Sequence, residues 1–147
     1  MELKTLYKFE KAVIMFLNSF DGWELEHSGD SKLCYDAIGK TPKGIKCIME
    51  MKFRKKYYED KMLEAEKLEC MMKFDKDIVK IYFVSDPKGT YMYWLDGIEK
   101  KFKTIKKFCP KSSNWAQGRL KKDVYLLPES IASYVYSYAT QVEKKVD

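Results

Sequence analysis

Three charged side chains in the stretch 32–56 have the types and spacing needed to hydrolyse a phosphodiester bond. Asp36 and Glu50 are carboxylates, and Lys52 follows Glu50 by two positions. A hard cation such as Mg²⁺ prefers a few oxygen ligands and keeps several waters. We therefore expect Asp36, Glu50 and the backbone carbonyl of Met51 to hold Mg²⁺, with Mn²⁺ as a substitute. A lysine beside the cation can hold or deprotonate an attacking water and steady the charge that develops on the phosphate.

Two strands joined by a turn would position these side chains. In the second strand apolar and polar residues alternate from Ile45 to Arg54, which is the pattern of a half-buried strand and places Glu50 and Lys52 on one face. In the first strand, Asp36 would share one face with Cys34 and Ile38. The turn would use three residues, namely Gly39, Pro42 and Gly44. Pairing of the strands would bring Asp36 beside Glu50.

The motif alone does not identify a site. An acidic residue, any residue and then lysine occur seven times in this sequence. Glu50 and Lys52 differ from the other pairs because they lie in an alternating strand that follows a strand with an aspartate. A solvated strand face remains the alternative interpretation of these residues.

The order of elements around this hairpin resembles a known family. The predicted order is a helix with Glu10, the strand WELEHS, the strand with Asp36, the strand with Glu50 and Lys52, a helix near 57–74 and the strand KIYFVS. Over about residues 4–96 this order is similar to the PD-(D/E)XK nuclease superfamily, and within it to the Holliday junction resolvase-like and phage nucleases. Tyr35 replaces the proline that the family has before the aspartate.

The resemblance implies a fold and some roles. The fold would be α/β, a mixed β-sheet flanked by helices with a restriction-endonuclease-like α-β-β-β-α-β core. Glu10 would be a catalytic helper at the edge of the metal site, whereas a surface carboxylate paired with a nearby lysine is the alternative. A polar residue of the second helix often reaches the site in this family, and Lys67 is a candidate for that role.

Bulk properties limit the class of protein. A chain of 147 residues makes one domain, so we expect a single nuclease-like domain over residues 1–147. The hydrophobic content of 46% argues against disorder, and no segment approaches the roughly 20 apolar residues of a membrane span. The first residues do not read as a signal peptide. Four cysteines without a CxxC pair and a single histidine give little support to a zinc site. We expect reduced thiols and a cytoplasmic location.

The charge predicts an anionic partner. The net charge is +6, and only Arg54 and Arg119 among 28 basic residues are arginine. Lysine suits phosphate contacts better than base readout. The segment 100–122 has nine basic residues and no acid, and a solvated loop is its alternative interpretation. The predicted nucleic-acid contacts are Lys43, Arg54, Lys55, Lys106, Lys107, Lys111, Arg119, Lys121 and Lys122.

Three helices are predicted from apolar spacing. Residues 4–20 place Leu6, Phe9, Val13, Phe16, Leu17 and Phe20 on an inward stripe. Residues 57–74 do the same with Tyr58, Met62, Ala65, Leu68 and Met72. A final helix would begin at Pro128 and turn Ile131, Val135, Tyr138 and Val142 inward.

The sequence thus predicts a Mg²⁺-dependent DNA endonuclease, with branched or structured DNA among its substrates. A homodimer is expected if both strands are cut, since two-fold symmetry supplies two matched sites. The first alternative is a noncatalytic nucleic-acid-binding or inhibitory interaction protein on the same fold. An RNA nuclease is a further alternative, and lysine richness also fits an AT-rich, phage-like genome.

Overall fold

The computed structural model describes residues 2–30, 32–110 and 119–137. The elements follow in the order α1 (Leu3–Phe20), β1 (Glu24–His27), β2 (Ala37–Lys40), β3 (Lys46–Phe53), β4 (Asp60–Glu64), α2 (Ala65–Met72), β5 (Val79–Asp86), β6 (Gly89–Trp94), α3 (Ile98–Lys101), β7 (Ile105–Pro110), β8 (Arg119–Pro128), the 3₁₀ turn η1 (Glu129–Ile131) and β9 (Tyr134–Ser137).

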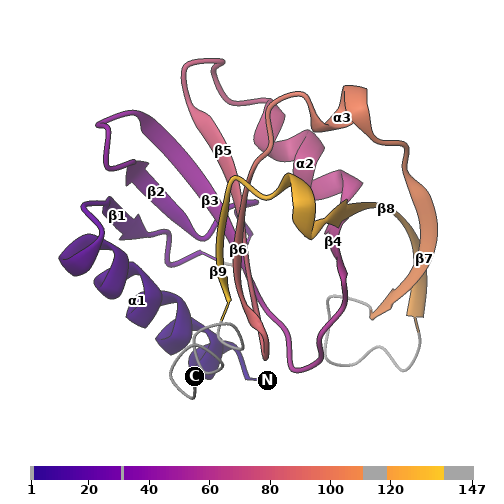
Figure 1. Ribbon diagram of the computed structural model, residues 1–147, viewed down its shortest axis with the longest axis horizontal. Helices are drawn as coiled ribbons and strands as arrows, with labels where there is room; N and C mark the ends of the chain where they lie inside the picture. The colour runs from indigo at the N-terminus through magenta and orange to yellow at the C-terminus, as the bar shows by residue number, and fades with distance from the viewer. Residues whose placement is uncertain (1, 31, 111–118, 138–147) are drawn as a thin grey trace, which may run out of the picture.

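A mixed sheet with the strand order β1-β2-β3-β5-β6-β9 forms the centre of the fold. β3 and β5 run parallel, and the other neighbours in this sheet are antiparallel. A second sheet has the order β4-β8-β7. Figure 1 shows α1 beside one side of the central sheet, with α2 and the second sheet on the other side. The predicted fold class, a mixed sheet flanked by helices, is confirmed.

Alternation along β3 divides the core into two parts. Cys47, Met49 and Met51 pack on the α1 side, together with Ile14 and Leu17 of that helix. Ile48 packs on the opposite side, in a cluster with side chains of α2, β4 and β8. Since successive side chains of a strand point to opposite faces, Glu50 and Lys52 lie on the side of Ile48. β3 therefore directs these two side chains toward α2.

The helix predicted over 4–20 is present as α1, but its inward face is different. Leu17 is buried as expected, while Phe9, Phe16 and Phe20 are exposed, the last by 79%. Glu10, which the sequence places beside the apolar stripe, is buried instead. The burial of Glu10 is made possible by a polar partner, His27.

The strand carrying Asp36 is shorter than predicted. β2 begins at Ala37, directly after Asp36. Cys34 and Tyr35 leave the sheet because their side chains pack on the α2 side, where the Tyr35 ring lies 5.5 Å from the Phe74 ring. Gly39, predicted in the turn, lies within β2. A Cβ atom at this position would collide with the carbonyl oxygen of Glu24.

Two predicted helices are wrong in part or in whole. Asp60–Glu64 forms the strand β4, and only Ala65–Met72 is helical, because pairing with β8 overrides the local preference of good helix formers. From Pro128 onward the chain forms η1 and then β9, which covers the edge of β6. Ile131 and Val135 are exposed, and Tyr138 and Val142 lie outside the described residues. The aromatic and β-branched run Tyr134–Ser137 suits this edge strand.

The sulfur chemistry also differs from the expectation of four reduced thiols. Cys34 and Cys70 form a disulfide with Cα atoms 6.1 Å apart. Cys47 is a free thiol in the core, and burial raises its pKa to about 11. Across the described ranges, none of the helices combines the length and apolar character needed to cross a membrane.

Candidate active site

Asp36 is fixed at the edge of β3 by its main chain and its side chain. Its N–H donates to the Met49 carbonyl at 2.8 Å, and its Oδ2 accepts the Met51 N–H at 2.8 Å. The carboxylate therefore takes the place that a longer β2 would have filled. The N–H and C=O of one residue in a strand point to the same edge, so the Met51 carbonyl also faces the Asp36 side.

Glu50 is a buried carboxylate with an incomplete set of partners. Its residue exposure is 8%, and its Oε1 lies 3.5 Å from Nζ of Lys67 on α2. Its Oε2 is buried and has no hydrogen-bond partner among the described residues. A buried polar atom without a partner costs free energy, commonly about 1–3 kcal/mol. This oxygen is the clearest irregularity in the otherwise satisfied core of the described residues.

The electrostatics of Glu50 place two carboxyl groups and two ammonium groups in one region. Burial raises the pKa of Glu50 to about 8, and the nearby Asp36 carboxylate acts in the same direction. The positive charges of Lys67 and Lys52 act in the opposite sense on this pKa. The predicted proximity of Asp36, Glu50 and Lys52 agrees with these interactions. Lys52 is exposed to solvent.

Glu10 approaches the site from α1. Its Oε1 is 2.8 Å from Nε2 of His27, and burial is the main cause of its raised pKa. The Asp36 carboxylate raises the pKa of Glu10 as well, and the Lys67 charge lowers it. Glu10 thus lies within electrostatic reach of two of the side chains around Glu50. The alternative of a surface carboxylate paired with lysine does not fit its burial.

The arrangement suits a divalent cation through its donor chemistry. The Asp36 carboxylate lies against the main chain of Met51, and an oxygen of Glu50 lacks a hydrogen-bond partner among the described residues. Over the same part of the chain, no three His, Cys, Asp or Glu side chains come together closely enough to hold a metal. Any ion at this site would therefore use two carboxylates rather than three, with the carbonyl and water completing its shell.

The predicted nucleic-acid contacts are spread over several elements. Lys43 lies in the turn before β3 and Lys55 follows β3, both exposed. Nη2 of Arg54 donates to the Met62 carbonyl at 3.4 Å. The β7–β8 hairpin carries Lys106, Lys107, Lys121 and Lys122. Lys111 and the side chain of Arg119 lie outside the described residues.

Several hairpin lysines have partners within the protein. Lys106 pairs with Asp123 at 3.4 Å, and Lys122 pairs with Glu64 at 3.4 Å. The Lys121 ammonium lies 5.9 Å from the centre of the Phe108 ring. The Lys106 and Asp123 side chains are both more than half exposed, so water and phosphate can compete for that lysine.

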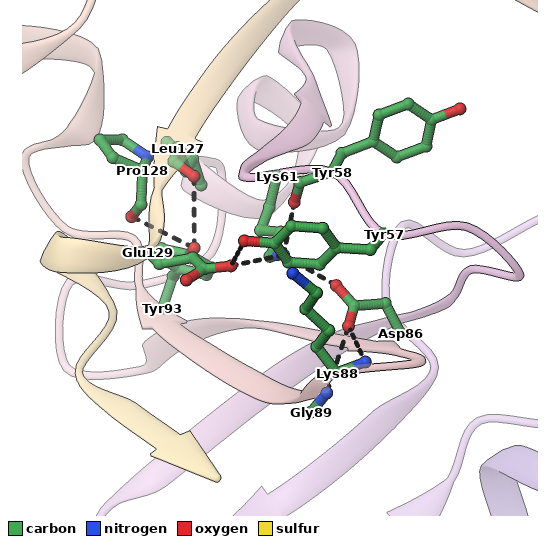
Figure 2. A network of polar contacts seen from close by, with 10 residues as sticks. All are labelled: Tyr57, Tyr58, Lys61, Asp86, Lys88, Gly89, Tyr93, Leu127, Pro128 and Glu129. Carbon is green, nitrogen blue, oxygen red and sulfur yellow. Dashed lines mark hydrogen bonds and ion pairs between the residues drawn. The ribbon is translucent and has the colours of Figure 1, made fainter. Parts of the chain in front are cut away.

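A second buried cluster, shown in Figure 2, was missed by sequence reasoning. The Lys61 ammonium is 2.7 Å from Asp86 and 3.1 Å from Glu129. Its Nζ also lies 4.4 Å and 4.1 Å from the ring centres of Tyr57 and Tyr91. Lysine in a charged stretch carries no local signal of burial. In β4, Lys61 and Leu63 lie two positions apart and so point to the same face of the strand. The apolar Leu63 was the indication in the sequence that Lys61 points inward.

Comparison with known proteins supports the fold. No protein-family model and no curated protein matches the sequence. Among solved structures, the chain is similar to Hjc, a Holliday junction resolvase of the archaeal hyperthermophile Archaeoglobus fulgidus. The TM-score is 0.55 at 12% identity, over 92% of this chain and 93% of that chain. The likeness is one of fold. It agrees with the architecture that the resemblance to PD-(D/E)XK nucleases implied.

Proposed function

We propose that the protein is a divalent-metal-dependent DNA endonuclease. The observation that carries this proposal is the buried Glu50 oxygen without a partner among the described residues, which lies in a region shared with the Asp36 carboxylate. A cation at this point would satisfy both carboxyl groups. The likeness of fold to a Holliday junction resolvase supports a nuclease and adds branched DNA to the candidate substrates.

Asp36, Glu50 and the Met51 carbonyl would hold Mg²⁺, or Mn²⁺ in its place. The ion would supply positive charge next to the phosphate under attack. Asp36 is pre-positioned for this role because the Met51 N–H fixes its carboxylate. Glu50 must give up its proton before it can hold a cation, and the ammonium groups of Lys67 and Lys52 favour the ionised form.

Lys52 is the side chain that would meet the substrate. Its ammonium is exposed on the face shared with Glu50, so it can donate a hydrogen bond to a phosphate oxygen as that oxygen gains charge. It can also orient the attacking water. Glu10 would add negative charge at the edge of the site and so favour a cation.

Duplex binding would use lysine contacts to phosphates. The exposed Lys43 and Lys55 flank the strand that carries Glu50 and Lys52, and the β7–β8 hairpin of the second sheet carries four further lysines. We further propose that the protein is a homodimer. Phe9, Phe16 and Phe20, which share one face of α1 and are exposed, form an apolar surface that a second copy would cover. Sedimentation velocity would show whether the protein is a dimer.

Cleavage assays with site variants test the activity. Asp36→Asn, Glu50→Gln and Lys52→Ala should each abolish Mg²⁺-dependent cutting of supercoiled, linear and branched DNA while the fold is retained. Matched controls are Glu99→Gln and Lys101→Ala, which alter an exposed acid-x-lysine pair on α3 and should leave cleavage unchanged. If any of the three site variants cuts DNA as fast as the parent, the assignment of Asp36, Glu50 and Lys52 to the catalytic site is wrong.

DNA binding without cleavage would favour the noncatalytic alternative. Simultaneous change of Lys106, Lys107, Lys121 and Lys122 to alanine should weaken binding equally across sequences. It should also flatten the dependence of log K on log salt by about 0.9 for each phosphate that the protein no longer neutralises. An unchanged slope would show that these hairpin lysines are solvent-exposed and do not contact DNA phosphates.

A further inference from the structure

His27 connects the helix that carries Glu10 to the strand segment that carries Asp36. Its Nε2 lies 2.8 Å from Oε1 of Glu10. Its own strand, β1, pairs with β2 so that His27 faces Ala37, and the next N–H, that of Ser28, donates to the Asp36 carbonyl at 2.8 Å. His27 is therefore connected to Glu10 through its side chain, and to Asp36 through the main chain of the next residue, Ser28.

The hydrogen bonds of the imidazole fix which nitrogen carries the proton. The Gly29 N–H donates to Nδ1 at 3.1 Å, so Nδ1 is an acceptor. The proton of the neutral ring is then on Nε2, which donates to Glu10. Gly29 has φ of +68°, a conformation that glycine adopts without strain and that brings its N–H back to the ring. The Tyr7 ring packs edge-on against the imidazole at 4.9 Å.

Each of these contacts restricts Glu10. Glu10 is only 1% exposed, so water cannot replace His27 as the hydrogen-bond partner of its carboxylate unless α1 moves. A carboxylate held by a single strong donor keeps one orientation. Without the donor, the buried Glu10 carboxylate would lose its hydrogen bond to His27 and would no longer be held in this orientation.

We propose that His27 is a positioning residue of the cation site, holding the Glu10 carboxylate in one orientation through their 2.8 Å hydrogen bond. The inference rests on the proposed function, since it assumes that the site binds a divalent ion. Glu10 acts here through its charge at the edge of the site. His27 acts only through Glu10, in the manner of the outer partners that orient the groups around metal centres.

The first test measures Mn²⁺ affinity by calorimetry on DNA-free protein. His27→Leu should weaken Mn²⁺ binding about 10- to 100-fold, as removal of an outer partner typically does. His27→Gln retains an N–H donor near the position of Nε2 and should restore affinity to within a few-fold of the parent. Glu10→Gln should weaken binding like His27→Leu, and the double variant should be no weaker than Glu10→Gln alone. Urea unfolding confirms that each variant is folded.

The outcomes separate this inference from the proposed function. A parent protein that does not bind Mn²⁺ removes both. Mn²⁺ binding in the parent that His27→Leu leaves unchanged overturns the positioning role alone. Additive effects of Glu10→Gln and His27→Leu overturn it too, because they would show that His27 acts by another route.

A second readout follows the imidazole directly. His27 is the only histidine in the sequence, so its ring nitrogen signals in an NMR spectrum are unambiguous. We expect a protonated Nε2 and an unprotonated Nδ1, and a shift of the Nε2 signal on addition of Mg²⁺ that is absent in Asp36→Asn. The opposite tautomer, or a signal that ignores Mg²⁺ in a parent that binds it, would contradict the proposal.

Discussion

Two groups of carboxylates lie on the same side of the central sheet, each with one buried member, Asp86 in the first and Glu50 in the second, and they differ in how their charge is compensated. Asp86 and Glu129 share the ammonium of Lys61, whose side chain is only 1% exposed (Figure 2). Asp36 and Glu50 share no such central cation, and the Glu50 Oε2 has no partner among the described residues. The first group is complete as folded, and the second is incomplete.

The pKa directions follow the same division. The Tyr57 hydroxyl and the Lys61 ammonium lower the pKa of Glu129, although burial alone would raise it. Burial and the Asp36 carboxylate raise the pKa of Glu50 to about 8. A structural cluster brings its own counter-charge, whereas a binding site leaves that charge to the ligand. The comparison therefore supports a stabilising role for the Lys61 group and the proposed cation-binding role for the Asp36–Glu50 group.

The largest expected effect is on stability, from Lys61→Met. This variant leaves Asp86 and part of Glu129 buried without a cation, which should cost about 3–5 kcal/mol of unfolding free energy. Lys88→Met is the matched control, because the exposed Lys88 ammonium lies 3.9 Å from the Tyr57 ring and should matter by under about 1 kcal/mol. Urea denaturation of both variants makes the measurement. Equal effects would end the distinction between the two groups.

Removal of the Cys34–Cys70 disulfide should rank second. The bond joins the segment before Asp36 to α2, which carries Lys67, so it braces the incomplete group and not the Lys61 group. The variant with both cysteines changed to alanine should have a free energy of unfolding about 2–4 kcal/mol lower than that of the parent. Reductant should lower the urea midpoint of the parent and leave that of the double variant unchanged. A parent midpoint that ignores reductant would contradict the prediction.

The pH dependence of stability should have opposite signs in the two groups. The pKa of Glu50 rises from 4.5 to about 8 on folding, so its stabilising contribution is present below pH 4.5 and is lost as pH rises to about 8. In metal-free buffer, Glu50→Gln should therefore gain stability relative to the parent across this window. The pKa of Glu129 is lowered, so Glu129→Gln should lose stability relative to the parent as pH rises through 4.5. Parallel profiles for the two variants would refute the contrast.

The smallest effect is expected from Lys67→Met. Its ammonium is 3.5 Å from Glu50, but its side chain is 36% exposed and Glu50 is mostly protonated at neutral pH. The change in stability should be at most about 1 kcal/mol. The pKa of Glu50 should rise further, because the Lys67 charge that lowers it is gone. A large drop in stability would show that Lys67 is the resident counter-ion of Glu50.

Local pattern was sufficient to predict the strand β3 and the nearness of Asp36 to it, while the roles given to these residues stay predictions. The alternation of β3 and the aspartate before β2 placed Asp36 near Glu50 without any knowledge of distant contacts. The start of β2 was misplaced because the Cys34 and Tyr35 contacts with the α2 side are long-range. β4 was misplaced for the same reason, since its pairing partner β8 lies far along the chain, with Glu64 opposite Val124.

The burial of charged residues was beyond the reach of sequence reasoning. Glu10 is buried with a partner, His27, that lies 17 positions away in the sequence. Lys61 is buried with Asp86 and Glu129, which lie 25 and 68 positions away. A charged residue is predicted at the surface unless its partner is known, and the partner becomes known only with the fold.

The most direct test of the central claim is a crystal structure grown with Mn²⁺, with anomalous data collected to locate the ion. The account predicts one strong anomalous peak between the Asp36 and Glu50 carboxylates, near the Met51 carbonyl, and no peak at the Lys61 group. Disappearance of the peak in Glu50→Gln would complete the assignment. A structure in which the Asp36–Glu50 region holds no Mn²⁺, while Lys67 or a water satisfies the Glu50 oxygen, would contradict it.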